Sequence, residues 1–361
     1  MKPILIAGPC SAESLEQVLA AADAVAGALC TVAASSRGPA DALPGTSAVG
    51  PQLTYFRAGL WKPRTMPGSF EGVGGAGLEW LAEVKRRYGW KVCCEVATPS
   101  HVEACLKAGI DMVWIGARTT ANPFQVQELA ESLRGVEIPV YVKNPVSHDL
   151  NLWCGAVERL FKCGVIRIGA IHRGVSSNSS LEYRNDPAWD LAIEFHSRYP
   201  ELPLLCDPSH IAGKAESVPE LSQRAINIGF DGLMVEVHND PSKALSDAAQ
   251  QLSPQEFSRL LGGLVIRDGV SSDVEFTRQI EQLRARIDDI DGNLLSLLGQ
   301  RMSVSEEIGR LKKESNVAIL QSGRWEEVLS RAVALGRSNG LSEDFVRSIF
   351  SLIHEESIHR Q

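Results

Sequence analysis

Several features that would assign the chain to a particular protein class are scarce or absent. No basic stretch followed by an apolar run opens the sequence, and we find no apolar segment of membrane-spanning length. Lys and Arg total 36 against 44 Asp and Glu, and this net charge of −8 argues against nucleic acid as the main partner. The 8 cysteines lack the pattern of a secreted disulfide framework. We therefore expect a cytoplasmic protein that binds neither nucleic acid nor membrane.

The chain has the size and composition of a soluble globular protein. Hydrophobic residues make up 44% and charged residues 22% of the 361 positions. That length exceeds one ordinary core but fits a large α/β domain followed by a smaller one. We expect the first domain to span residues 1–263, a linker 264–272, and the second domain 273–361.

The first domain repeats one pattern, a short β-rich run followed by an amphipathic helical stretch such as 77–88 or 151–163. The runs that we predict to be strands are 4–8, 53–59, 91–96, 111–116, 139–143, 165–171, 203–207 and 231–237. Eight such repeats favour a closed parallel (β/α)8 TIM barrel over its rival, an open doubly wound sheet. Residues 32–51 are rich in Ala, Gly, Ser and Pro, and they are predicted to form a surface loop.

The second domain is predicted to be all helical. Apolar residues at 280, 283, 287, 290, 294 and 297 follow a helical period, which 304, 308 and 311 continue, so a long helix should end near Glu314. Two shorter helices are expected over 322–338 and 342–359. Because so long a helix cannot bury its apolar seam alone, we expect this three-helix domain to form a dimer.

Charged and polar residues follow the predicted barrel strands, where TIM barrels carry their catalytic groups. The cations are Arg57, Lys62, Arg64, Arg118, Lys143 and Arg173. Such a cluster is costly unless anions fill the space between its members, and phosphates or carboxylates suit the donors of arginine. A second set comprises Cys10, His210, Glu236 and Asp247. Its donors suit a divalent transition metal such as Mn, Fe, Co or Zn.

The motifs "GPCSAES", "KPRT", "GAR", "HRG", "DPSH" and "ALSDAAQQL" resemble those of type I 3-deoxy-D-arabino-heptulosonate 7-phosphate (DAHP) synthase, from residue 4 to about 262. The resemblance implies metal-dependent condensation of phosphoenolpyruvate with erythrose 4-phosphate, an early step of the shikimate pathway. The related KDO 8-phosphate synthase carries an Asn-containing motif in place of Lys62-Pro63-Arg64-Thr65, so this chain favours the four-carbon sugar.

The same resemblance implies roles for individual residues of the barrel site. The metal ligands would be Cys10, His210, Glu236 and Asp247, with Mn²⁺ as first choice and Fe²⁺, Co²⁺ or Zn²⁺ as alternatives. Phosphoenolpyruvate would contact Arg57, Lys62, Arg118, Lys143 and Arg173. Erythrose 4-phosphate would contact Arg64, Thr65 and Asp207. Lys62 is the candidate proton donor to the new alkoxide, with a metal-bound water as its competitor.

In the helical domain, the apolar stripe continues into a cation, Arg301, which needs an anion or a route to solvent. Lys312 lies on the same face, about 16 Å further along the helix. Long side chains at these positions can close on one small ligand. Arg284 lies roughly 25 Å before Arg301, so only a partner copy of the helix can bring it to the same ligand.

Residues 280–361 resemble the all-helical AroQ-type chorismate mutase, which rearranges chorismate to prephenate without a cofactor. By motif, the binding residues would be Arg284 from the partner, Arg301, Lys312, Arg324, Ser357 and Gln361, with Lys312 and Gln361 meeting the ether oxygen. The chain departs from the family at Trp325, where a Glu is usual, and at Gln321, where an Asp is usual. These departures leave the partner of the substrate's hydroxyl unassigned.

The two resemblances together predict a bifunctional enzyme, DAHP synthase followed by chorismate mutase, that forms a homodimer or a higher oligomer. The alternative is a DAHP synthase whose helical domain only dimerises and senses an effector. Retained Arg301, Lys312 and Gln361 favour catalysis, whereas Trp325 favours the alternative. Prephenate or chorismate bound to the mutase domain is the predicted feedback signal to the barrel.

Overall fold

The computed structural model describes residues 3–35, 52–63, 68–176, 182–266, 273–316, 318 and 322–361. The chain divides into two compact units, residues 1–269 and 270–361. The predicted loop beyond residue 35, most of the predicted linker, Arg64, Thr65 and Gln321 lie outside the described residues.

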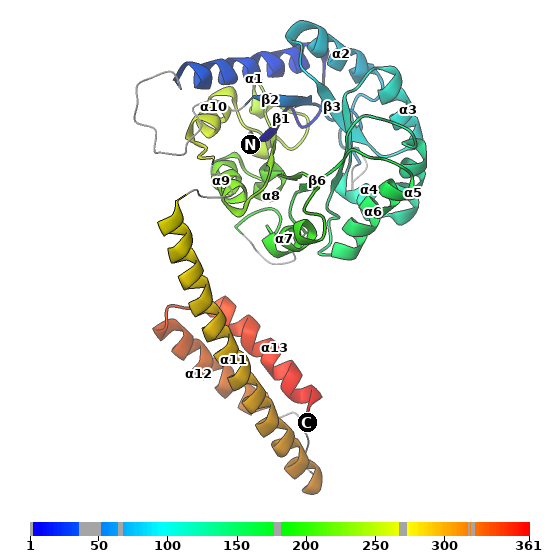
Figure 1. Ribbon diagram of the computed structural model, residues 1–361. Coiled ribbons are helices and arrows are strands. Elements are labelled where there is room, and N and C mark those ends of the chain that lie inside the picture. The colour runs from blue at the N-terminus through cyan, green and yellow to red at the C-terminus, as the bar shows by residue number, and fades with distance from the viewer. Residues whose placement is uncertain are drawn as a thin grey trace. The chain divides into compact units, whose positions relative to one another are not determined.

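The first unit is a closed barrel of parallel strands in sequential order, which confirms the predicted fold class (Figure 1). Its strands are β1 (Ile4–Gly8), β2 (Leu53–Arg57), β3 (Val92–Val96), β4 (Met112–Ile115), β5 (Val140–Lys143), β6 (Ile168–His172), β7 (Leu204–Cys206) and β8 (Gly232–Glu236). Each lies within a run predicted from the sequence or extends it by one residue. β1 pairs with β8 to close the barrel, with Gly8 opposite Glu236.

Helices surround the barrel on its outside, as Figure 1 shows. They are α1 (Leu15–Ser35), α2 (Ala76–Tyr88), α3 (Pro99–Lys107), α4 (Ala117–Thr120), α5 (Pro123–Ser132), α6 (Leu150–Lys162), α7 (Trp189–Arg198), α8 (Pro208–Ala212), α9 (Val218–Ile228) and α10 (Pro254–Gly263), with 3-10 turns η1 (Ala215–Ser217), η2 (Pro241–Lys243) and η3 (Ala248–Gln250). Outward strand residues pack on these helices in the main core. Inward residues such as Met112, Trp114 and Met234 form a separate core that fills the barrel.

Helix α1 corrects two expectations from the sequence. Residues 32–35 belong to this helix and not to a loop, because the helix continues to Ser35. Its segment Leu15–Ala34, with a mean hydropathy of 1.6, is also long and apolar enough to span a membrane by composition alone. In this fold α1 packs on α10 and α2, and its Val18, Ala22 and Val25 are buried in the barrel core. Packing of the buried face of α1 in the barrel core accounts for part of this apolar composition.

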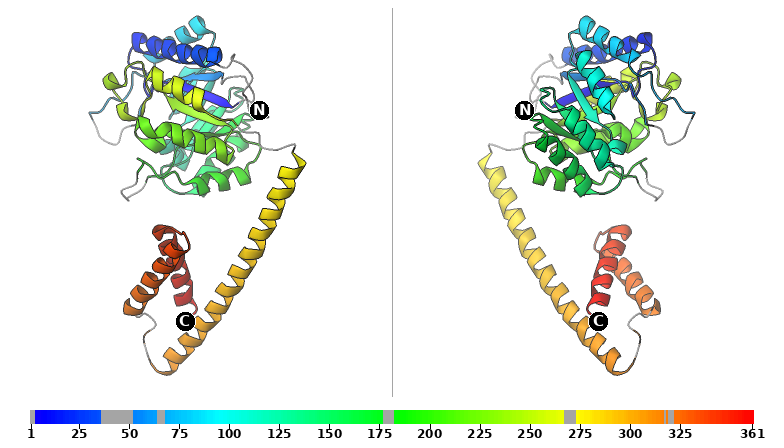
Figure 2. Two further views of the ribbon diagram at one scale, coloured as in Figure 1. Left: turned by 90° about the vertical axis from the view of Figure 1, so that its left-hand side faces the viewer. Right: turned by 90° about the vertical axis from the view of Figure 1, so that its right-hand side faces the viewer.

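The second unit consists of α11 (Val274–Glu314), α12 (Ser322–Ser338) and α13 (Glu343–His359), in agreement with the predicted helices. Asp273 caps α11 by accepting hydrogen bonds from the backbone N–H groups of Glu275 and Phe276. Helices α12 and α13 pack on each other around Ala332, Val333 and Val346. Figure 2 shows α11 as one uninterrupted helix.

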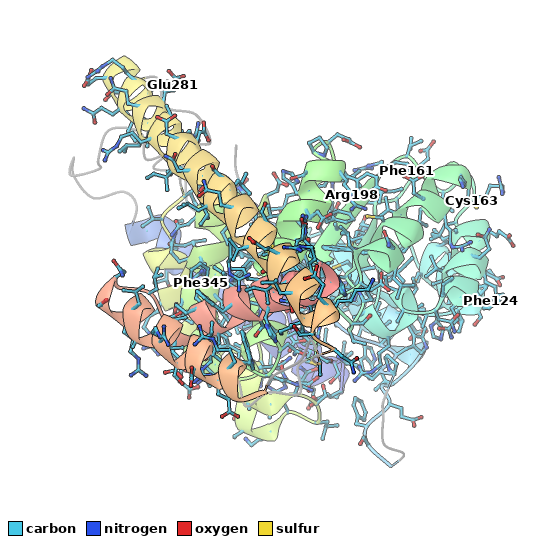
Figure 3. All side chains as sticks on the ribbon, turned by 90° about the horizontal axis from the view of Figure 1, so that it is seen from below. Phe124, Phe161, Cys163, Arg198, Glu281 and Phe345 are labelled. Carbon is cyan, nitrogen blue, oxygen red and sulfur yellow. The ribbon has the colours of Figure 1, made fainter. Side chains whose placement is uncertain are left out.

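The apolar stripe of α11 is largely uncovered within this chain. Its members are Leu283, Ile287, Ile290, Leu294, Leu297, Val304, Ile308 and Leu311, and their exposed fractions run from 42% to 62%. Glu281, on the first turns of α11, is also exposed, and its side chain stands clear of the helix (Figure 3). The stripe is the kind of surface that a second copy would cover, and dimerisation stays a prediction.

Candidate active sites of the two units

The barrel unit has a cavity of about 300 Å³ at the end of the barrel where its strands finish. Of the residues predicted for this site, the wall includes Lys62, Arg118, Lys143, Arg173, His210 and Asp247. Lys143 is the last residue of β5, Arg173 directly follows β6, and Arg118 lies on the short helix α4 after β4. Because parallel strands end at the same rim, residues far apart in the sequence line one cavity.

Other predicted residues lie outside the wall of this cavity. Arg57 is only 1% exposed, and its Nη2 donates to Glu236 Oε1 at 3.0 Å and to the Cys10 carbonyl at 3.3 Å. Its guanidinium also stands 5.2 Å from the centre of the Trp114 ring. Asp207 and Glu236 are fully buried. As described, Arg57 and Asp207 therefore support the wall residues from behind.

Asp207 joins Lys143 and His210 in a buried charged cluster. Its Oδ2 lies 2.5 Å from Lys143 Nζ and 2.8 Å from His210 Nδ1. Burial alone would raise the pKa of Asp207, but His210 and Lys143 outweigh burial and hold the pKa well below its usual value. Asp207 therefore stays ionised and fixes the Lys143 ammonium at the cavity wall.

The predicted metal ligands lie near one another without forming a metal cage. Cys10 Sγ is 3.3 Å from Asp247 Oδ2, and Lys62 Nζ donates to the same sulfur at 2.9 Å. His210 Nδ1, which is paired with Asp207, lies 3.8 Å from Glu236 Oε1. Among the described residues, no group of three His, Cys, Asp or Glu side chains is arranged to hold an ion. In kind, the thiol, imidazole and carboxylates fit a divalent transition metal.

The environment of Cys10 favours the neutral thiol in the arrangement described. Complete burial, with Glu236 nearby, raises the pKa of Cys10 to about 12, although Lys62 acts in the opposite direction. A metal-bound cysteine is a thiolate. Ligation would therefore release the Cys10 proton, and Lys62 would have to leave the sulfur.

The geometry of the GPC turn follows from Gly8. Gly8 has φ = +146°, and a Cβ built on it would stand 2.2 Å from the Arg57 carbonyl oxygen. Only glycine lets β1 and β2 approach this closely. The turn thereby brings the Cys10 backbone within reach of Arg57 and of Gln251, whose Oε1 accepts from Cys10 N at 2.9 Å.

The cavity wall also contains Glu95, Arg184 and Asn185, which we did not identify from the sequence. Arg184 Nη1 donates to Asp247 Oδ1 at 2.9 Å, and Arg173 Nη1 donates to Asn185 Oδ1 at 2.9 Å. Glu95 Oε2 accepts from Trp114 Nε1 at 3.0 Å. A lone acid in the apolar run of β3 was a signal that could have identified Glu95. No pattern marked the segment that carries Arg184 and Asn185.

The helical unit has a cavity of about 370 Å³ that combines residues of all its helices. The predicted residues in its wall are Arg301, Lys312, Arg324, Ser357 and Gln361. Arg301 Nη1 donates to Ser357 Oγ, and Lys312 Nζ donates to Gln361 Oε1 at 3.3 Å. Partial burial lowers the pKa of Arg301 from its usual value. Arg284 is exposed and is not part of this wall, and its role depends on the predicted partner copy.

Trp325, one of the two residues at which this chain differs from the chorismate mutase motif, also lines this cavity. Its ring stacks on that of His354, with centroids 4.1 Å apart and planes inclined by 13°. Trp325 belongs to α12 and His354 to α13, so the stack joins these two helices in the cavity wall.

Comparisons with known families assign both units. Residues 43–265 match the model of the DAHP synthetase I family, and residues 283–361 match that of chorismate mutase type II. A phospho-2-dehydro-3-deoxyheptonate aldolase of Thermotoga maritima is 31% identical over 71% of this chain and 67% of its own length. A 2-dehydro-3-deoxyphosphooctonate aldolase of Helicobacter pylori is 26% identical over 73% of this chain and 95% of its own length.

Solved structures agree with these sequence matches. The crystal structure of the T. maritima DAHP synthase superposes with a TM-score of 0.59 and 28% identity, covering 73% of this chain and 68% of the other. A truncated form of the T. maritima enzyme gives a TM-score of 0.57 at 26% identity, over 73% of this chain and 85% of that one. In both superpositions the matched part is smaller than the whole chain.

Proposed function

The chain belongs to the DAHP synthetase I family and carries a chorismate mutase type II domain, which makes it a bifunctional shikimate-pathway enzyme, and from this premise we propose how its cavities work. The barrel would condense phosphoenolpyruvate with erythrose 4-phosphate and water to give DAHP and phosphate. The helical unit would rearrange chorismate to prephenate. The observation that carries both assignments is the cationic wall of each cavity.

In the barrel, the wall places Lys62, Arg118, Lys143, Arg173 and Arg184 around one cavity, against the carboxylates of Glu95 and Asp247. This excess of cations suits phosphoenolpyruvate, whose phosphate and carboxylate would be bound by Arg118, Lys143 and Arg173. Their donors are fixed beforehand, since Asp207 holds Lys143 and Asn185 holds Arg173. Arg64 and Thr65 keep their proposed role at the phosphate of erythrose 4-phosphate, which rests on the motif alone. The motif also proposes Asp207 for that substrate, but its side chain is buried behind the wall, so we propose that it acts there by holding Lys143.

The carbon–carbon bond forms between the enol carbon of phosphoenolpyruvate and the aldehyde carbon. Water adds to the phosphate-bearing carbon, phosphate leaves, and the aldehyde oxygen takes up a proton. Lys62 is the residue that we propose as the proton donor, because its ammonium lies at the cavity wall and Lys143 is the one other lysine among the described residues that line the cavity. Lys143 is already held by Asp207 at 2.5 Å.

We also propose that Cys10, His210, Glu236 and Asp247 bind a divalent metal, with Mn²⁺ as first choice. When bound, such an ion would supply Lewis-acid polarisation of the aldehyde. Neighbouring side chains hold two of these proposed metal ligands, Glu236 and Asp247, in place. Gln250 Nε2 donates to Glu236 Oε2 at 2.7 Å, and Arg184 Nη1 donates to Asp247 Oδ1. Such outer contacts orient metal ligands.

In the helical unit, catalysis would consist of positioning and electrostatic stabilisation. Arg301 and Arg324 would bind the two carboxylates of chorismate, with Arg284 added by a partner copy. Lys312 and Gln361, already in contact at 3.3 Å, would face the ether oxygen that gains negative charge as its bond breaks. The alternative, a non-catalytic sensing domain, is supported by Trp325. The retained cationic wall favours catalysis.

The two activities can be separated in the full-length enzyme. Lys62→Met should lower condensation by about 10²-fold or more, the contribution of a positioned acid, and leave the mutase unchanged. Arg301→Ala should lower mutase activity by about 10²-fold or more through loss of an electrostatic contact and leave condensation unchanged. Rates of DAHP formation and chorismate consumption are the measurements.

The control is Arg310→Ala on the same helix, α11, because Arg310 is exposed, pairs with Glu314 and lies outside the cavity wall. It should leave both rates unchanged. A wild-type chain that consumes no chorismate while forming DAHP would establish the non-catalytic alternative for the helical unit.

We further propose that prephenate or chorismate bound in the helical unit inhibits the barrel. The support is that a ligand-sized cationic cavity is carried on the same chain as the earlier reaction of the pathway. Binding in one unit changes the other only through differential affinity for two states of the chain.

A further inference from the structure

We propose that the stacked pair Trp325–His354 recognises the ring hydroxyl of the ligand in the helical unit, with His354 as the hydrogen-bond acceptor. The inference rests on the proposed mutase function and concerns how that site selects its substrate. Both rings line the same cavity as Arg301 and Lys312. Their stack, at 4.1 Å between centroids, fixes the His354 ring in the wall.

The other polar side chains of this wall already have partners. Ser357 Oγ accepts from Arg301 and donates to the Ile353 carbonyl at 2.7 Å. Ser305 Oγ donates to the Arg301 carbonyl at 3.2 Å. Gln361 Oε1 accepts from Lys312. The described wall contains no Asp or Glu side chain, so a hydroxyl donor in the ligand needs a neutral acceptor.

His354 can provide that acceptor. Within the described part of the chain, no hydrogen bond involves its ring nitrogens, and the stack on Trp325 is its ring contact. A neutral imidazole offers one donor and one acceptor, whereas an indole offers a donor only. Because the two rings are inclined by only 13°, their edges run in nearly parallel planes. The pair therefore adds one acceptor and one donor of neutral rings to the wall of this cavity.

The charges of the site favour a neutral acceptor over an acidic one. Arg301, Lys312 and Arg324 leave the wall strongly cationic, which suits a ligand with two carboxylates. A carboxylate in the wall would compete with the ligand for these cations. Partial burial and then the charge of Arg301 lower the pKa of His354, so its ring is neutral near pH 7. The His354 ring can thus accept a hydrogen bond from the ligand without adding a negative charge to the wall.

The test compares full-length variants on chorismate and on its analogue that lacks the ring hydroxyl. His354→Leu should lower kcat/KM for chorismate about 10-fold, the cost of one unmade hydrogen bond to a buried group. It should change kcat/KM for the hydroxyl-free analogue by less than about two-fold. His354→Asn or His354→Gln, which place an amide oxygen near one or other ring nitrogen, should recover most of the loss.

The control is Trp325→Phe, which keeps an aromatic ring for the stack, against Trp325→Ala, which removes it. Equal losses on both substrates in His354→Leu would show a merely structural role and overturn the proposal, as would no loss on either. If the wild-type chain turns over neither compound, the mutase function fails separately. In that case, calorimetric titration of the wild-type chain with chorismate and with the hydroxyl-free analogue tests whether the site binds the hydroxyl. Equal affinities for the two compounds would overturn the proposed hydroxyl contact.

Discussion

At the scale of single residues, the chemistry of the barrel site depends on the surroundings of Cys10. Its side chain is fully buried, its sulfur accepts from Lys62, and Asp247 lies 3.3 Å away. A buried thiol with those neighbours is either an inert core residue or a metal ligand that loses its proton when an ion binds. The carboxylates of Glu236 and Asp247 beside it favour the ligand, since an ion would offset their charge.

We predict that Cys10→Ser weakens metal binding by more than the roughly 10–100-fold that loss of an outer-shell contact costs. A hydroxyl is a poorer ligand than a thiolate for soft and borderline ions. The metal content of full-length protein, stripped with a chelator and titrated with Mn²⁺ or Zn²⁺, is the measurement. Cys30→Ser is the control, because Cys30 is exposed on α1. Unchanged affinity in Cys10→Ser would remove Cys10 from the site.

At the scale of elements, the mutase cavity depends on how closely α13 and Gln361, two residues beyond its end, approach α11. Gln361 follows α13 and lies against Gly309 of α11, where an added Cβ would stand 2.6 Å from Gln361 Cα and 2.8 Å from its carbonyl oxygen. Such contacts with backbone atoms cannot be relieved by rotating a side chain. The absence of a side chain at 309 is what lets Gln361 reach Lys312.

Gly309→Ala should therefore lower mutase kcat/KM about 10-fold or more, while helix propensity alone would stabilise α11 by about 1 kcal/mol. Condensation by the barrel should be unaffected. Gly292→Ala on the same helix is the matched control, because nothing lies within 4 Å of its added Cβ. Chorismate consumption and thermal unfolding of the full chain test this prediction. Wild-type mutase activity in Gly309→Ala would show that Gln361 is not needed where the structure places it.

At the scale of the whole molecule, the proposed feedback requires that a ligand in the helical unit changes the rate in the barrel. We predict that prephenate inhibits condensation by the wild-type chain and by Arg310→Ala. It should not inhibit Arg301→Ala, because that variant loses a cation of the prephenate site. Basal condensation should be equal in all three proteins.

Initial rates of DAHP formation across a prephenate titration provide the measurement. Equal inhibition of Arg301→Ala and wild type would place the inhibitory site in the barrel. No inhibition of the wild type would refute coupling by prephenate altogether. Chorismate is tested in the same way with Arg301→Ala, in which its conversion is suppressed.

The sequence was sufficient to predict the elements of both units and their order. Strands of this barrel are short apolar runs bounded by turn residues, and helices such as α12 and α13 carry a clear apolar period, so local pattern was sufficient. It also determined that Lys143 and Arg173 lie at one rim, because each ends or follows a parallel strand. The Arg301 and Lys312 pair followed from helical spacing alone.

Which of these side chains face a cavity depends on tertiary packing, which local pattern does not reveal. Arg57 and Asp207 end or follow strands as Lys143 and Arg173 do, yet they are buried in ion pairs behind the wall, because closure of the barrel turns them toward Glu236 and Lys143. Arg184 and Asn185 reach the wall from a segment without a pattern. Trp325 and His354 meet because α12 packs on α13, and side-chain contacts between helices depend on packing geometry that local spacing does not encode.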